Sequence, residues 1–396
     1  MSAGTVMILG GGIYQLPLIR KAKEMHLTTV VVSIPGPYPG LKEADEVLSL
    51  DTRDAEAVLS AASARKIDGI LTTGTDVAVR TIGTVTERLR LPGISARAAR
   101  IVTDKAEMKR AFSGRVSTAE FEIVRTVEEA VRAAGRIGYP VVMKACDVSG
   151  SRGVTRVDCP EALPEAYRAS EKVSRADYYI VEKYVSGHEI GLDAYVSGGR
   201  ILFAGAHEKY VCRAGGVTIP AGHGFPLPMS TPLEEELMRQ LEAVVTSTGM
   251  DNCAVNCDIM LLPGDKVSVI EAGGRCGATC IPELIELHTG IDYYRQMILG
   301  ALGEPLDFRI TQRVPCQARL LFSRKSGTVG HIDRDGLRRL KEQGFSVSLD
   351  VGEGDRVEQV RNGTDRIGQI IASRVSEQEM EKALQLAEEC IRLEDG

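Results

Sequence analysis

The chain has no long hydrophobic run. Hydrophobic residues make up 43% of its 396 positions and charged residues 26%, which is ordinary for a soluble globular protein. No apolar stretch approaches the roughly 18 residues that a membrane-spanning helix needs, so we expect no membrane segment. The first residues also lack the charged and then apolar pattern of a secretory signal, and they enter a strand pattern at once. We therefore expect a cytoplasmic protein.

An excess of positive charge is also missing. The chain carries 48 basic and 54 acidic side chains, a formal net charge of −6. Broad nucleic-acid binding requires a basic face, so this balance argues against a nucleic-acid partner. A site that is basic only locally remains compatible with it.

The nine cysteines lack the spacing of a zinc site. Cys253 and Cys257 are separated by three residues, as are Cys276 and Cys280, and neither pair matches a zinc-binding knuckle. We interpret most of them as small buried hydrophobic residues. No histidine or asparagine pattern marks Cys276 as a nucleophile.

The glycine-rich turn near the N-terminus lacks a third glycine. Gly10-Gly11-Gly12 follows an apolar strand, but Gln15 stands where a dinucleotide-binding motif would continue. Alternating strands and helices over the first hundred residues predict a parallel sheet. Such sheets bind ligands at the carboxyl ends of their strands, so we expect this turn and Gly74-Thr75-Asp76 to face a small-molecule cleft.

Two β-rich segments carry the most informative pattern. Residues 255–260 and 267–275 flank the turn signal Pro263-Gly264-Asp265 and predict a hairpin. With a four-residue loop, Asp258 and Glu271 would face each other about 5 Å apart. With a three-residue loop they would lie on opposite faces.

Two carboxylates this close cannot both ionise cheaply without a cation or a shared proton. Together with nearby Arg275 they suit Mg²⁺ that carries a nucleotide triphosphate. The alternative interpretation is a solvated hairpin in which the acids occur by chance.

Lysines and a glycine-rich loop precede this hairpin. Lys144 ends a strand with a buried pattern, where a lysine is costly unless it meets an anion. The loop 149–153 offers backbone N–H groups and hydroxyls that can fold over phosphates. Lys105 stands in the first turn of a predicted helix, whose positive end also favours a phosphate. Each feature alone is better explained as a surface lysine or an ordinary turn, whereas together, and followed by the acidic hairpin, they favour a nucleotide.

Two carboxylates surround the next chain reversal. In Glu182-x4-Gly187-x-Glu189, backbone groups after the strand could hydrogen-bond a purine, and Glu189 could accept from ribose hydroxyls. Farther along, residues 207–223 are read as an irregular polar stretch that could touch a carboxylate substrate or could simply be a solvated loop.

In this order, the elements resemble the ATP-grasp superfamily. Residues 1 to about 100 resemble its N-terminal domain. The sequence from Glu271 through Leu284, with Ser326-Gly327 and residues 362–368, is most similar to the L-amino-acid ligase branch. The motifs that carry the resemblance are Lys105, Lys144, Ser149-Gly150-Ser151-Arg152-Gly153, Glu182-x4-Gly187-x-Glu189, Asp258 and Glu271-x3-Arg275.

The resemblance implies a fold that mixes α/β and α+β parts. A Rossmann-like N-terminal domain would cover residues 1–100. An ATP-grasp domain would cover 101–311, with a mobile lid at about 115–185. A small α+β domain would form residues 312–396.

The resemblance also implies roles for the residues. Arg275 and Lys144 would be catalytic, and Asp258 and Glu271 would bind Mg²⁺ or Mn²⁺. Many family members place asparagine two residues after the glutamate, where this chain has Gly273, so Asn256 is a candidate replacement ligand. The residues that would bind ATP are Lys105, Lys144, Ser149, Gly150, Ser151, Gly153, Glu182, Lys183, Val185 and Glu189.

We therefore predict an ATP-dependent carboxylate–amine ligase that forms an amide or peptide bond through an acyl phosphate. Its partners would be a small carboxylate and a small amine, and the resemblance implies a homodimer. One alternative is a carboxylase or purine-pathway ligase that uses bicarbonate or formate. A second alternative is a nucleotide-binding sensor without turnover, and a third, a nicotinamide oxidoreductase, rests on the glycine turn alone.

Overall fold

The computed structural model describes residues 4–148, 150, 152–214, 217–361 and 363–394. They form two compact units. The first contains Met1–Ala204, Pro228–Gly277 and Tyr294–Leu306, and the second contains Gly205–Leu227, Ala278–Tyr293 and Asp307–Gly396. The three predicted domains, 1–100, 101–311 and 312–396, are continuous segments and do not coincide with these two units, each of which combines several segments. The domain division stays a prediction. Among the described helices, none combines the length and the apolar composition needed to cross a bilayer.

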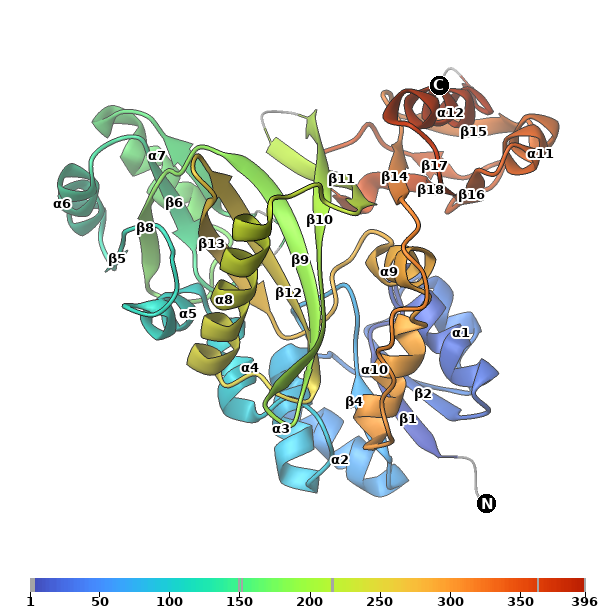
Figure 1. Cartoon of the computed structure of the whole chain (residues 1–396), viewed down its shortest axis with the longest axis horizontal. Coiled ribbons are helices and arrows are strands. Elements are labelled where there is room, and N and C mark those ends of the chain that lie inside the picture. The colour runs from blue at the N-terminus through green and yellow to red at the C-terminus, as the bar shows by residue number, and fades with distance from the viewer. Residues whose placement is uncertain (1–3, 149, 151, 215–216, 362, 395–396) are drawn as a thin grey trace. The chain divides into compact units, whose positions relative to one another are not determined.

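The first unit begins with a four-stranded parallel sheet in the order β3-β2-β1-β4 (blue in Figure 1). Its central strands are runs of buried aliphatic residues, as expected for a parallel sheet. Two of its helices, α2 and α4, start after polar capping residues: the side chain of Asp54 accepts from Ala57 N–H, and that of Ser95 accepts from Ala98 N–H. The elements are β1 (Thr5–Leu9), α1 (Leu16–Glu24), β2 (Thr28–Ser33), η1 (Pro39–Lys42), β3 (Glu46–Ser49), α2 (Ala55–Arg65), β4 (Gly69–Leu71), α3 (Val79–Leu89) and α4 (Ala96–Val102).

A second, antiparallel sheet has the order β5-β8-β6-β7 and packs with two helices around its own apolar core (green in Figure 1). Helix α6 starts after Thr126, whose hydroxyl accepts from Glu129 N–H, and ends at Gly138, which has φ +81°. This sheet lies within the segment predicted to form a lid, and its motion stays a prediction. The elements are β5 (Phe121–Val124), α6 (Val127–Ile137), β6 (Val141–Ala145), β7 (Val154–Val157), η2 (Pro160–Ala162), α7 (Leu163–Glu171) and β8 (Tyr179–Lys183).

The remaining strands of the first unit form an antiparallel sheet with the strand order β13-β12-β9-β10. Helix α8 packs against α5 and β13. It starts with proline in its first turn and with the Ser230 hydroxyl accepting from Leu233 N–H. The elements are α5 (Lys105–Phe112), β9 (His188–Ser197), β10 (Arg200–Ala214), α8 (Thr231–Thr248), β12 (Cys253–Leu262), β13 (Lys266–Gly273) and α10 (Tyr293–Leu302).

The hairpin of β12 and β13 has the predicted acid pair but not the predicted loop. Leu262 pairs with Lys266, so three residues form the loop, and on that register alone the acids would not meet. A β-bulge between Asp258 and Ile259 then shifts the register by one residue. Asp258 is thereby opposite Glu271 after all, and Asn256 is opposite Gly273.

The second unit contains the C-terminal part of β10, followed in sheet order by β11, β14, β18 and β16, and a separate three-stranded sheet, β17-β15-β19. The capping box predicted at Ser376 is present: its hydroxyl accepts from Glu379 N–H, and the Glu379 carboxylate accepts from Ser376 N–H. The elements are β11 (Val217–Phe225), α9 (Ile281–Thr289), β14 (Cys316–Phe322), β15 (Gly327–Ile332), α11 (Arg334–Glu342), β16 (Ser346–Leu349), β17 (Arg356–Val357), η3 (Gly363–Asp365), β18 (Arg366–Ser373), α12 (Glu377–Glu389) and β19 (Ile391–Glu394).

The structure corrects the expectation of an irregular stretch over residues 207–223. His207, Glu208 and Lys209 lie inside β10, and His223 lies in β11, where it pairs with Lys209. Strand pairing outweighs the polar composition, because β-propensity depends mainly on the neighbours of a strand.

Candidate active site

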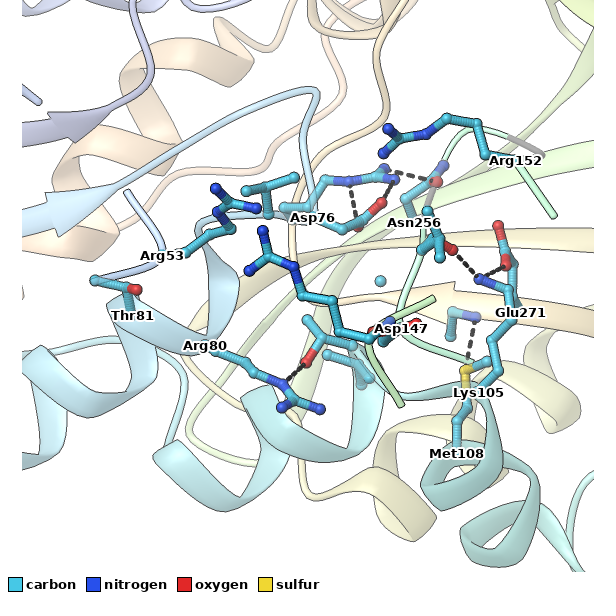
Figure 2. A pocket seen from close by; sticks show the side chains of 18 of the residues that line it. Arg53, Asp76, Arg80, Thr81, Lys105, Met108, Asp147, Arg152, Asn256 and Glu271 are labelled. Atoms are coloured by element: carbon cyan, nitrogen blue, oxygen red, sulfur yellow. Dashed lines mark hydrogen bonds and ion pairs between the residues drawn. The ribbon is translucent and has the colours of Figure 1, made fainter. Parts of the chain in front are cut away.

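The first unit has a cavity of about 500 Å³ next to the β12–β13 hairpin. Its lining includes the loop after β4, the start of α5, the loop after β6 and the hairpin itself, together with residues near α2, α3, α4 and the end of α7. Figure 2 shows Asp76, Asn256, Lys105 and Glu271 around this cavity. Lys105, Asn256, Glu271 and Arg275 were all predicted from the sequence, and the structure brings them together here.

Arg275 is clamped by a carboxylate from the N-terminal sheet. Its Nε lies 2.8 Å from Asp76 Oδ1, and its Nη2 donates to Asp76 Oδ2 at 2.9 Å. Nη1 donates to Asn256 Oδ1 at 2.9 Å. Burial by itself would lower the pKa of Arg275, but the Asp76 carboxylate raises it above its usual value. The guanidinium therefore stays charged, and its plane is fixed by two-point contact.

A second buried carboxylate holds Asn256 in place. The Asn256 amide donates to Asp193 Oδ2 at 2.9 Å, and Asp193 Oδ1 accepts from Gly277 N–H at 2.8 Å. Asp193 is fully buried. The Asn256 oxygen accepts from Arg275 and keeps a second lone pair, and its role as a metal ligand stays a prediction.

Gly273 leaves room for this clamp. A Cβ at position 273 would lie 3.0 Å from Asp76 Oδ1 and 3.6 Å from Cζ of Arg275. The space where the asparagine of similar proteins would begin therefore holds the ion pair of Asp76 and Arg275.

Lys105 meets Glu271 on the other side of the cavity. It lies in the first turn of α5, as predicted, after the N-cap Asp104. Its Nζ donates to the Val148 carbonyl at 2.8 Å and lies 3.4 Å from Glu271 Oε2. Burial opposes its charge, but Glu271 and Asp76 together raise the pKa of Lys105, so it remains a cation facing the cavity.

The hairpin acids fit a magnesium ion that arrives with a nucleotide. Glu271 lines the cavity, whereas Asp258 is opposite it in register but is not among the described lining residues. Within the described part of the chain, no three His, Cys, Asp or Glu side chains gather as a metal site of their own. Magnesium in nucleotide sites uses one or two carboxylates plus phosphate and water, so two acids suffice.

Lys144 belongs to a buried cluster of two lysines and one glutamate. Lys144 Nζ donates to Glu182 Oε2 at 2.8 Å, and Lys109 Nζ donates to Glu182 Oε1 at 3.0 Å. Burial alone would raise the pKa of Glu182, but the two lysines hold it below its usual value. Burial lowers the pKa of Lys109 to about 8. Two lysine cations share one carboxylate, so the cluster carries a net positive charge that would attract a phosphate.

The predicted glycine loop joins β6 to β7. Gly150 and Gly153 have φ values of +71° and +65°, which glycine adopts without strain. Asp147 anchors the start of the loop by accepting from Ser174 Oγ at 2.6 Å and from Arg175 N–H at 2.8 Å. Ser149 and Ser151 lie outside the described residues.

The predicted adenine and ribose residues lie between the end of β8 and the start of β9. Lys183 Nζ donates to the Gly138 carbonyl at 2.7 Å, Val185 is half-buried, and Glu189 lies in β9 opposite Met260. Gly187 is required between them, because a Cβ there would lie 2.2 Å from the Leu261 carbonyl oxygen. These roles stay predictions.

Sequence reasoning missed two of the residues that shape this site, Lys109 and Asp193. Lys109 carries a signal, since it follows Lys105 by one helical turn, whereas Asp193 stands inside an apolar strand. Asp76 was predicted to face a cleft and lines this cavity, but its contact with Arg275 was not predicted. The cavity is also lined by several arginines that were not predicted to contribute: Arg53, Arg80, Arg152 and Arg175.

Known proteins resemble this chain in sequence and fold. A model of the ATP-grasp domain matches residues 137–283, and a model of the L-amino acid ligase C-terminal domain 2 matches residues 319–395. The crystal structure of phosphoribosylglycinamide synthetase from Anaerococcus prevotii superimposes with a TM-score of 0.80 and 27% identity, covering 99% of both chains. The chain therefore contains an ATP-grasp domain and resembles ATP-grasp ligases over its length.

Two further relatives support this ATP-grasp assignment. L-amino acid ligase from Bacillus licheniformis has the same fold, with a TM-score of 0.80, 18% identity and coverage of 99% of both chains. D-alanine–D-alanine ligase from Geobacter sulfurreducens is 28% identical over 222 residues, which are 53% of this chain and 69% of the relative. The predicted fold class and ligase class are therefore confirmed.

Proposed function

We propose that this ATP-grasp protein joins a small carboxylic acid to a small amine, with hydrolysis of ATP to ADP and phosphate. A carboxylate oxygen would attack the γ-phosphorus of ATP, which releases ADP and gives an acyl phosphate. The amine would then attack the acyl carbon, lose a proton and expel phosphate. We favour an amino acid as the acid, because the C-terminal domain resembles that of L-amino acid ligases.

The observation that carries the proposal is the placement of Lys105, Glu271 and a fixed Arg275 in one cavity. Lys105 and Lys144 would hold the phosphates of ATP. Asp258 and Glu271 would hold magnesium, which supplies neutralising charge when bound. The Arg275 guanidinium would stabilise the negative charge on the acyl phosphate and on the later tetrahedral oxyanion.

An acyl phosphate also has to be protected from water. The β5–β8 sheet and the loop after β6 would close over the nucleotide, as expected for a lid. No residue of the chain has to form a covalent intermediate in this scheme.

A coupled assay of ADP release tests the proposal. The protein would be screened with ATP and magnesium against a panel of amino acids, other carboxylic acids, bicarbonate and formate, and then with amines. Mass spectrometry would identify the product. ADP release that requires both an organic acid and an amine, with a matching amide, supports the proposal.

A purine-pathway type of ligase is the second candidate, favoured by the 27% identity to a phosphoribosylglycinamide synthetase. ADP release with bicarbonate or formate, or with an amino acid only when a phosphoribosyl amine is supplied as the amine, would favour that class. Tight binding of ATP without turnover under every combination would instead favour a nucleotide sensor.

A further inference from the structure

A second cavity lies wholly within the second unit. It has a volume of about 1020 Å³ and is bounded by β10, β11, β14, the segment 358–361 and α12. It lies where the pairing of β11 with β14 stops, at Gly222 and Arg319. None of the residues assigned above to ATP or magnesium lines it. Four of its lining residues fall within the stretch 207–223 that the sequence offered for a carboxylate substrate: Tyr210, Val211, Cys212 and Ala221. We call it the α12 groove.

Part of the α12 groove is apolar. Leu320 and Phe322 are buried and form a small core cluster with Ile219, and Val360 packs against this cluster. Leu384 of α12 also lines the groove. An apolar surface with a few polar groups is typical of a small-molecule site.

Most charged residues of the groove stand on two opposing sides, whereas Glu358 is an acid on the loop that also carries Arg361. Glu377, Glu381 and Glu388 are spaced by four and seven residues, which places them on one face of α12. Arginines come from the strand and from the loops: Arg319, Arg324 and Arg361. The acids therefore face cations across the groove.

These opposite charges are separated by more than direct contact. Arg319 Nε lies 4.0 Å from Glu381 Oε1, and Arg324 Nη2 lies 3.6 Å from Glu388 Oε2. A direct contact between such groups is about 2.7–2.9 Å. The side chains of each pair could therefore turn toward a charged group of a ligand and lose little interaction energy with each other.

Arg319 is held ready for an anion. Its side chain is 4% exposed, and its guanidinium stacks on the ring of Tyr210. Its buried Nη2 has no hydrogen-bond acceptor within the described residues. A buried donor without a partner is costly, so an acceptor supplied by a ligand would stabilise the site.

We propose that the α12 groove is a second binding site, for a zwitterion such as an amino acid or a short peptide. The ligand carboxylate would accept from Arg319, the ammonium group would lie against Glu381 and Glu377, and an apolar side chain would pack on Leu320 and Phe322. A simple anion would be repelled by the glutamates and a simple cation by the arginines, whereas a zwitterion satisfies both sides. The site is independent of the proposed reaction.

Isothermal titration calorimetry on the full chain without ATP tests this assignment, with the dipeptide L-alanyl-L-phenylalanine as the probe. We expect saturable binding. N-acetyl-L-alanyl-L-phenylalanine, which has no ammonium group, and L-alanyl-L-phenylalanine amide, which has no carboxylate, should each bind at least about tenfold more weakly than the dipeptide itself. Equal binding by the capped forms would overturn the assignment.

Variants locate the binding site. Arg319→Met and Glu381→Gln should weaken binding of the dipeptide at least about tenfold, and Glu381→Gln alters a side chain that is 60% exposed, so the fold is expected to survive. Arg338→Met, on exposed α11 outside the groove, is the matched control and should bind normally. Arg275→Met, in the other cavity, should also bind normally.

Two results would overturn the proposal. Dipeptide binding that is lost in Arg275→Met but kept in Glu381→Gln would place the ligand in the ATP cavity. Absent binding, together with a mass that rises with protein concentration in sedimentation, would assign the groove to a second copy of the chain.

Discussion

At the scale of single residues, the contacts of Arg275 leave its guanidinium little freedom to rotate. Asp76 contacts its Nε and Nη2, and Asn256 accepts a hydrogen bond from its Nη1. Such preorganisation is what stabilises charge that appears during a reaction, because no reorganisation is needed at that moment.

Arg275→Met should therefore lower kcat by about 10²-fold or more, the usual cost of removing one charge-stabilising group. The dissociation constant of ATP, measured by calorimetry, should change much less, because other residues hold the nucleotide. Arg309→Met, whose side chain is 87% exposed, is the control and should keep full activity. Unchanged turnover of Arg275→Met would sink the proposed role.

Asp76→Asn should lower kcat by about tenfold, because the neutral amide no longer fixes the guanidinium. Asp76 acts through Arg275, so the double variant Asp76→Asn/Arg275→Met should be no slower than Arg275→Met alone. Steady-state kinetics of the four proteins give the coupling. Strictly additive losses would show that Asp76 has a separate role.

Lys109 predicts a pH dependence of nucleotide binding. Burial lowers its pKa to about 8, so it loses its charge as the pH rises through that value. Lys144 is then the only charged lysine of the cluster paired with Glu182. The positive charge of Lys144 is neutralised by that carboxylate, and the cluster attracts a phosphate less strongly. The affinity for ATP should fall as the pH rises through about 8, and Lys109→Met should remove this dependence. Titrations between about pH 7 and pH 9 check it.

At the scale of elements, the hairpin shows what sequence patterns can and cannot predict. Alternation and turn residues predicted both strands and the facing of Asp258 with Glu271. The predicted loop was one residue too long, and the bulge cancelled the error. Nothing in the sequence marks the bulge, because residues around Ile270 are ordinary strand residues and the register is set by β9 on the other side of β12.

Substitution of two glycines by alanine should have opposite effects. Gly187→Ala would bring a Cβ to 2.2 Å from the Leu261 carbonyl oxygen, so the connection between β8 and β9 must shift and the affinity for ATP should fall. Gly135, inside α6, has nothing within 4 Å of its Cβ position, and Gly135→Ala should raise the free energy of unfolding by about 0.5–1 kcal/mol. Denaturant titration and nucleotide binding on both variants separate these effects, and equal behaviour would contradict them.

At the scale of the whole molecule, the sequence predicted the order of the elements better than the contacts between distant ones. The ATP-grasp class followed from motifs spread over residues 105–275. Asp76 and Arg275 are 199 positions apart, and no local pattern links them. The strands within residues 207–223 were missed because their polar residues pack between neighbouring strands that the sequence does not reveal.

The second unit should lose stability in acid. His223 is 7% exposed, and burial, together with His207, Lys209 and Arg319, lowers its pKa well below the usual value. The unfolded chain binds a proton there below about pH 6.5, but the folded chain does not, so stability falls as the pH drops below about 6.5. Denaturant midpoints of the chain and of His223→Phe between about pH 5 and pH 7.5 check this, since the variant should lose less in acid. An equal loss would contradict the role of His223.

The contact between Asp76 and the hairpin has a practical consequence. The parallel sheet does more than line the cavity, because Asp76 in the loop after β4 orients the Arg275 guanidinium on which the proposed chemistry depends. A shortened protein that begins near residue 100 would therefore keep the lysines and the acids but would lose this support. Such a fragment could still retain nucleotide, yet it would be a poor starting point for engineering a minimal ligase.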